Sequence, residues 1–175
     1  MFESIKKRIA QYLIKRKFAG NSKEVSFNNF LKESVKFLII MPANENDFIH
    51  TYDIIKYLEI HRKSVTIFCQ AHRISTIPEK EKYKFIPYAN SDISKIYLPE
   101  KSFLEKVEQK YFDVIIDLNH EESLFCCAIT NYFKSNFRIG FQKQNSDRYY
   151  NFQIQNNERN SEISYRNLLN SLQMF

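Results

Sequence analysis

The chain has 175 residues, of which 43% are hydrophobic and 26% charged, and its formal net charge is +6. This length and composition suit one globular domain with a single core and argue against a disordered protein. Three cysteines cannot build a disulfide framework, and no apolar run approaches the roughly 20 residues that span a bilayer, so we expect a cytoplasmic protein in a reducing compartment.

A basic amphipathic helix followed by a linker is predicted for residues 1–22. The first 36 residues contain nine Lys or Arg and three acidic residues, so the whole net charge resides there. Apolar residues recur at helical spacing, and basic residues occupy much of the remaining circumference. The apolar positions are Phe2, Ile5, Ile9, Tyr12 and Leu13, and the basic positions are Lys6, Lys7, Arg8, Lys15, Arg16 and Lys17. Either the apolar stripe packs on the domain and the lysines are solvated, or the helix binds an anionic surface, which would be a membrane leaflet or RNA phosphates.

The body of the chain, residues 23–160, alternates between apolar runs and amphipathic segments. Strands are predicted at 36–41, 65–69, 84–87, 96–98, 113–118 and 137–141. Helices are predicted at 26–33, 47–61, 101–110 and 121–133, and a last helix with Ser161 as its cap is predicted within the C-terminal segment 161–175. Strands separated by helices imply right-handed crossovers and a parallel sheet. The predicted fold is α/β, a Rossmann-like three-layer sandwich with a mostly parallel sheet.

Polar residues follow two of the predicted strands. Asn46, Asp47 and His50 come after the strand at 36–41, and Asn119 and His120 come after the strand at 113–118. Ligands of open α/β sheets bind at the carboxyl ends of the strands, so these residues predict a polar crevice. Asp47 has a simpler interpretation as the N-cap of the helix that follows.

Motifs for common cofactors are absent from the sequence. No G-x-G-x-x-G, G-x-x-x-x-G-K-[ST] or G-x-S-x-G occurs, so no dinucleotide or other cofactor is expected. Cys69 and His72 are close, but with His61 and His120 they do not form the paired pattern of a zinc site, and no metal is expected. A basic and aromatic cluster, interpreted either as a nucleic-acid surface or as a solvated strand and turn, comprises Arg138, Lys143, Arg148, Tyr149 and Tyr150.

Taken in order, these motifs resemble the N-terminal domain of the heptosyltransferase family, inverting glycosyltransferases that transfer heptose onto the inner core of lipopolysaccharide. The segment NDFIHTYDII at 46–55 stands where that family has Gly-Asp and an amphipathic helix. FDVIIDLNH at 112–120 and FRIGF at 137–141 are similar to the family's strands DVVIDLQG and RIGF. SEISYRNLLNSLQMF at 161–175 resembles the helix that links the family's two domains, so the resemblance covers residues 36–175.

The resemblance implies half of a GT-B fold, in which Asp47 would be the general base that takes a proton from the acceptor hydroxyl. Two departures weaken this implication: Asn46 replaces the glycine before the aspartate, and the family's donor-binding domain has no counterpart in the sequence. We therefore expect a non-catalytic, glycosyltransferase-like pseudoenzyme that binds a macromolecular partner, with a protein or a second domain supplied in trans as that partner.

Two alternatives remain. The first is the acceptor-side component of a split sugar transferase, with Asp47 as its base. The second is an RNA- or ribosome-associated factor that uses the basic N-terminal helix, a helix that could also place the protein at the inner membrane surface.

Overall fold

The structure, a computed structural model, describes residues 2–18 and 28–175. It is an α/β fold around one six-stranded, all-parallel sheet with the order β3-β2-β1-β4-β5-β6. The strands are β1 Lys36–Ile40, β2 Ser64–Gln70, β3 Lys84–Tyr88, β4 Tyr111–Asp117, β5 Lys134–Phe141 and β6 Phe152–Ile154. This is the strand order of the doubly wound Rossmann fold, which reverses direction between β1 and β4. The predicted Rossmann-like three-layer fold is confirmed.

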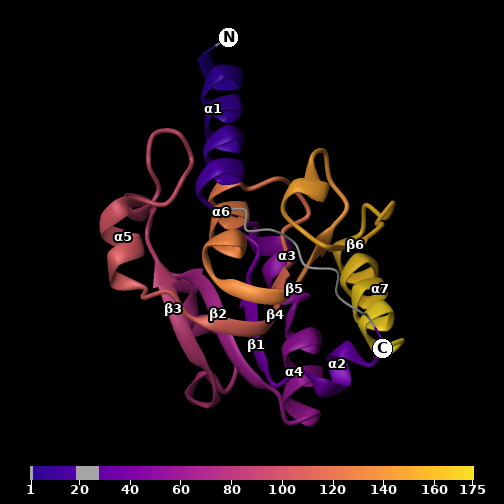
Figure 1. The fold of residues 1–175 in the computed structure, drawn as a ribbon. Helices are drawn as coiled ribbons and strands as arrows, with labels where there is room; N and C mark the ends of the chain where they lie inside the picture. Colours follow the sequence, from indigo (N-terminus) through magenta and orange to yellow (C-terminus); the bar gives the residue numbers. More distant parts are fainter. Residues whose placement is uncertain (1, 19–27) are drawn as a thin grey trace.

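Helices cover both faces of the sheet (Figure 1). One face packs against α2 Phe30–Glu33, α3 Glu45–Ile49, α4 Tyr52–Ile60 and α7 Ser161–Gln173, and the other packs against α5 Lys101–Lys106 and α6 Leu124–Tyr132. Alternate residues of β1 enter the two cores, with Phe37 and Ile39 on the first face and Leu38 and Ile40 on the second. Because both faces are covered, the central parts of β1 and β4, at 37–40 and 114–116, are continuous apolar runs, and the sequence therefore predicts these strands. Short 3₁₀ turns lie at η1 Ala71–Thr76, η2 Lys80–Lys82, η3 Asn90–Asp92 and η4 Ser146–Arg148.

The N-terminal helix α1, Phe2–Lys17, forms a further layer outside the sandwich (Figure 1). It packs on α6 rather than on the sheet, and its first turns project past the domain. Ala10 and Ile14 are fully buried in a third core cluster to which α6 contributes Leu124, Cys127 and Ala128. Within residues 2–18 and 28–175, no helix is both long enough and apolar enough to cross a membrane.

Two predicted elements differ from the structure, and one strand of the structure was not predicted. The predicted strand at 96–98 is wrong: this segment is a loop whose Tyr97 has a φ of 64°, and Leu98 is buried in the α1–α6 cluster instead of a sheet. The helix predicted at 47–61 is two helices, α3 and α4, separated at His50 and Thr51. The short edge strand β6 was not predicted, because its three residues lack a recognisable period.

The helix ends also differ from the predictions. Ser161 is the first residue of α7 and not its cap, because the side chain of Asn160 accepts a hydrogen bond from the Ile163 amide (3.1 Å). The first helix ends at Lys17, and the linker predicted up to residue 22 lies outside the described residues. Of the helix predicted at 26–33, the structure shows α2 from Phe30 to Glu33.

Candidate functional site

Three of the five predicted crevice residues meet where the strand order reverses, at the carboxyl ends of β1 and β4. Asp47 lies in α3, just after β1, and Asn119 and His120 follow β4. The predicted N-cap role of Asp47 is wrong. Asn44 caps α3 by accepting a hydrogen bond from the Asn46 amide (2.9 Å), because it occupies the extended position that precedes the helix. The carboxylate of Asp47 is therefore free to contact other elements.

Both carboxylate oxygens of Asp47 face groups of the same chain. The Ser161 hydroxyl at the start of α7 donates a hydrogen bond to Oδ1 (2.6 Å), and Nδ1 of His120 lies 3.6 Å from Oδ2. Asp47 is only 8% exposed. A carboxylate in this setting joins α3 to α7 and has little surface left for a ligand.

His120 is held between aromatic rings. Its imidazole stacks on Tyr165 of α7, with ring centroids 4.7 Å apart, and meets the edge of Phe141 at 4.3 Å. Burial lowers the pKa of His120 below its ordinary value of 6.5; the Asp47 carboxylate opposes this shift, and Lys143 adds to it. Nε2 of His120 is buried and has no hydrogen-bond partner among the described residues. The ring is therefore mainly neutral at pH 7 and acts as a packing element.

Helix α7 closes the crevice. Besides stacking on His120, Tyr165 donates its hydroxyl proton to the Leu118 carbonyl oxygen at the end of β4 (2.6 Å), and Tyr165 itself is almost fully buried. The two other predicted crevice residues stay at the rim. Asn46 is exposed, and His50 ends α3, where its backbone amide donates to the Asp47 carbonyl oxygen (3.1 Å). The sequence places these residues near one another but does not reveal that a distant helix fills the space between them.

Asp117, the last residue of β4, is a buried carboxylate that the sequence analysis did not single out as a site residue. Its Oδ1 accepts hydrogen bonds from the backbone amide (3.0 Å) and the Nδ2 group (2.7 Å) of Asn119. Its Oδ2 accepts from the Tyr150 hydroxyl (2.5 Å) and lies 3.7 Å from Nζ of Lys143. Asn119 in turn accepts from the Ala43 amide (3.1 Å), which ties the loop after β1 to β4. The carboxylate is fully buried and fully partnered, as a structural charge must be.

Gly140 of β5 makes this network possible. It pairs in register with Asp117, and a β-carbon at Gly140 would lie 2.9 Å from ring atoms of Tyr150. Any larger residue would push the Tyr150 hydroxyl away from Asp117. The two segments that carry the family resemblance, at 112–120 and 137–141, thus have a structural reason to contain an aspartate and a glycine.

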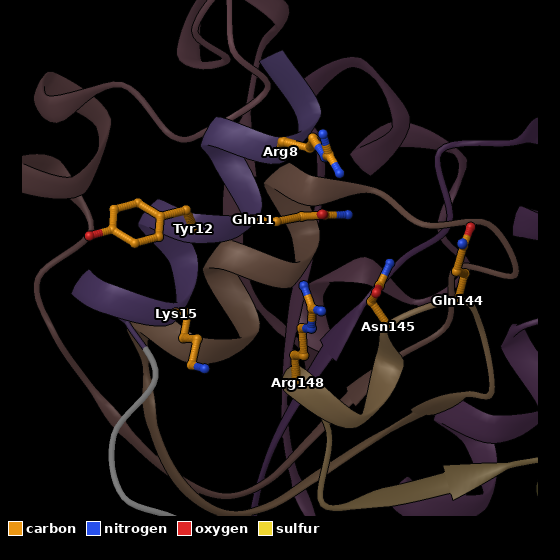
Figure 2. Close-up of a pocket in the computed structure, with 7 residues that line it drawn as sticks. All are labelled: Arg8, Gln11, Tyr12, Lys15, Gln144, Asn145 and Arg148. Carbon is orange, nitrogen blue, oxygen red and sulfur yellow. The ribbon is translucent and has the colours of Figure 1, made fainter. Parts of the chain in front are cut away.

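A second candidate site lies between α1 and the loop that joins β5 to β6 (Figure 2). A cavity of about 550 Å³ is lined by Arg8, Gln11, Tyr12, Lys15, Gln144, Asn145 and Arg148. Figure 2 shows Arg148 and Asn145 reaching from the loop toward Gln11, while the Tyr12 ring points to the other side of the helix. No ion pair joins Arg8, Lys15 or Arg148 to a carboxylate in the part of the chain that the structure describes. The cavity therefore has a surplus of positive charge.

The apolar stripe predicted on α1 is mostly turned to solvent. Phe2 is 81%, Ile5 49%, Ile9 45% and Tyr12 61% exposed, and only Leu13 of that set is partly buried. The helix docks through the narrower face formed by Ala10 and Ile14, because these residues pack against Cys127 and Ala128 of α6. The interpretation that the predicted stripe packs on the domain is wrong for those four residues.

The remaining predicted basic residues differ in their surroundings. Lys6 pairs with Glu3 on the same helix (2.8 Å), and Lys7, Arg16 and Lys17 are exposed. The basic and aromatic cluster predicted around β5 is not a continuous surface, because Tyr149 and Tyr150 are buried and the Lys143 side chain is only 5% exposed, whereas Arg148 is exposed. Among the described residues, no group of three or more His, Cys, Asp or Glu side chains could hold a metal ion.

The sequence model of a family of unknown function, DUF6913, matches residues 4–175. The chain belongs to this family. A comparison with curated proteins found no match. Because the match starts at residue 4, the unit that defines DUF6913 includes almost all of α1 as well as the Rossmann-like domain.

Proposed function

We propose that this chain is a non-catalytic, glycosyltransferase-like module that acts by binding a macromolecular partner. The observation that carries the proposal is the crevice at the strand reversal, which is filled by the chain's own last helix. Ser161 and Tyr165 of α7 occupy the positions from which a ligand would reach Asp47 and His120. A Rossmann-like fold normally binds ligands at this point.

The contacts of Asp47 weigh against a role as general base. A base must come within hydrogen-bonding reach of the proton that it abstracts, about 2.6–3.2 Å between heavy atoms. The nearest hydroxyl to Asp47 is that of Ser161 at 2.6 Å, and an acceptor sugar would have to displace it together with the first turn of α7. Asp117 is fully buried behind the same crevice and has hydrogen bonds to both oxygens. Neither carboxylate is placed to take up a new proton donor.

The resemblance to the heptosyltransferases supports the glycosyltransferase-like part of the proposal. Asp47 follows the first strand of the sheet, and Asp117 and Gly140 are paired neighbours on β4 and β5. These positions agree with the order of the family's motifs. Fold alone does not determine activity, so the resemblance supports a common ancestry and not a shared chemistry.

The exposed features that suit a partner lie on α1. Its solvent face combines four large apolar side chains with arginines and lysines, of which only Lys6 is paired with a carboxylate in the described structure. Apolar groups gathered at the surface of a folded domain mark interaction sites. The proposal therefore assigns partner binding to α1 and not to the sheet.

Two experiments test this proposal. Isothermal titration calorimetry with UDP-glucose, GDP-mannose and ADP-glucose should show no saturable binding. A photoreactive benzoylphenylalanine should cross-link the protein to a partner in cells when it replaces Tyr12, but not when it replaces Ile60, an exposed residue on α4. Saturable sugar-nucleotide binding with transfer activity that disappears in Asp47→Asn would contradict the proposal.

The split sugar transferase remains a second candidate because Asp47 and His120 are neighbours at the strand reversal (3.6 Å), with 22% of the His120 side chain exposed. If a partner supplied the donor site and moved α7, this pair would face the acceptor. The test is the glycan profile of cells whose only copy carries Asp47→Asn. An unchanged profile eliminates this candidate, and a truncated glycan supports it.

A further inference from the structure

We propose that the solvent face of α1 docks on a bilayer surface that contains anionic phospholipids, with a lipid phosphate entering the basic cavity between α1 and η4. This inference goes beyond the proposed function, because it assigns to α1 a lipid surface in addition to the macromolecular partner. It combines two features of one helix, the exposed apolar stripe and the cavity beside it.

The apolar stripe has the form of an interfacial helix. Phe2, Ile5, Ile9 and Tyr12 are spaced by three, four and three residues, so their side chains lie along one face of α1. That face points away from α6, on which Ala10 and Ile14 are buried. A helix of 16 residues is about 24 Å long and can lie in the headgroup region with one face immersed by roughly 5–10 Å. The domain would then sit on the water side of α1.

The charges around the stripe favour an anionic surface. Arg8 and Lys15 flank it on the side of the cavity, and Arg148 faces them from η4. Gln11, Gln144 and Asn145 add amide groups that can donate hydrogen bonds to phosphate oxygens. The basic cavity would bind the phosphate of a lipid headgroup, while the apolar stripe beside it would contact the acyl chains.

Acidic groups near the patch are few and mostly engaged. Glu3 binds Lys6 and the Tyr97 hydroxyl, and Glu122 accepts weakly from Gln11 Nε2 (3.4 Å). Asp147 is exposed beside Arg148 in η4. The basic residues of α1 and η4 outnumber these three carboxylates, so the patch attracts an anionic surface.

Two other occupants fit the patch less well. Single-stranded RNA would use the cations and could stack on Tyr12, but it offers nothing for the aliphatic side chains of Ile5 and Ile9. A second copy of the chain would bring two α1 helices together along the stripe. Each helix carries six basic residues and one acidic residue, so like charges would oppose one another.

Vesicle flotation tests the inference with the full chain. The protein should float with mixed vesicles of phosphatidylcholine and phosphatidylglycerol, should not float with pure phosphatidylcholine, and should dissociate as salt is raised. Arg8→Gln with Lys15→Gln should weaken binding roughly 30-fold, because each basic residue near such a surface contributes about a factor of five. Ile5→Ser with Ile9→Ser should weaken it by roughly tenfold or more.

Matched variants control for each change. Lys80→Gln with Lys84→Gln removes the same charge from exposed positions near β3, and Ile49→Ser with Ile60→Ser removes two isoleucines that are 57% and 69% exposed on α3 and α4. These two controls should bind vesicles like the parent. All variants change exposed residues, and an unchanged urea midpoint will show that each one is folded.

Several results would overturn the inference. They are equal binding to neutral and anionic vesicles, equal losses in the control variants, and a gel shift with single-stranded RNA in place of vesicle binding. A concentration-dependent dimer that Ile5→Ser with Ile9→Ser dissociates would assign the stripe to a second copy. Loss of vesicle binding alone would leave the non-catalytic module intact, whereas Asp47-dependent sugar transfer would overturn that proposed function and leave vesicle binding unaffected.

Discussion

Replacing Tyr150 by Phe tests whether the buried network around Asp117 stabilises the end of the sheet. The substitution removes one hydroxyl and keeps the ring that packs against Gly140. The lost hydrogen bond is 2.5 Å long, joins a residue that is 4% exposed to a carboxylate that is fully buried, and leaves Asp117 Oδ2 with only Lys143 at 3.7 Å. Hydrogen bonds to charged groups contribute about 1.5–3 kcal/mol to stability. We expect a value in the upper part of this range, because the substitution leaves the buried Asp117 carboxylate short of a hydrogen-bond donor. We expect a loss of about 2–3 kcal/mol in the free energy of unfolding.

Tyr149 provides a matched control next in sequence. Its hydroxyl is also buried but lacks a well-formed hydrogen bond to any described residue, and Glu122 is among the acidic groups near it. Tyr149→Phe should therefore change the free energy of unfolding by less than about 0.5 kcal/mol or increase it. Urea unfolding followed by far-UV circular dichroism measures both variants, and the thermal midpoint of Tyr150→Phe should fall by roughly 5–10 °C. Equal effects of the two substitutions would refute the reasoning.

Three further predictions concern the same region and the cysteines. Gly140→Ala should destabilise the protein by about 1–3 kcal/mol in urea unfolding, because its β-carbon meets the Tyr150 ring at 2.9 Å; a neutral result would contradict the close contact. Burial lowers the pKa of His120 below 6.5, so below that pH the unfolded chain binds more protons than the folded chain. The free energy of unfolding should therefore fall as the pH drops below about 6.5, and His120→Gln should make the profile flatter; identical profiles for the two proteins would count against this assignment. Burial raises the pKa of Cys69 to about 11 and of Cys126 to about 12, so Ellman's reagent should label neither thiol until the protein is denatured, and rapid labelling of the native protein would show that they are accessible.

The sheet could be predicted from the sequence because its central strands carry their signal locally. Residues 37–41 and 114–116 are unbroken apolar runs, and each of these strands is followed by a segment with helical spacing. The helix face that α1 buries could not be predicted in the same way. Both of its sides carry apolar residues, and the choice of Ala10 and Ile14 depends on the small side chains that α6 presents, which only the folded chain brings into contact.

The position of the candidate site could be predicted from the sequence, but the closure of its crevice by α7 could not. Asp47, Asn119 and His120 follow strands that are adjacent in the sheet, so the alternation of elements was enough to bring them together. Their closure depends on Ser161 and Tyr165, which lie more than 100 residues after Asp47 in the chain and show no pairing signal in one sequence. Asp117 was missed because a carboxylate at the end of a strand looks the same in sequence whether it faces solvent or a buried tyrosine.

Because α1 packs on α6 and not on the sheet, a force or a surface that acts on α1 can separate it from the domain. Because no strand contacts this helix through the main apolar cores, lifting it away would uncover Leu124, Cys127 and Ala128 and leave the sheet with its own helices in place. The contacts that hold α1 lie in a cluster outside the two cores that flank the sheet, so release of this helix and unfolding of the sandwich are separate events.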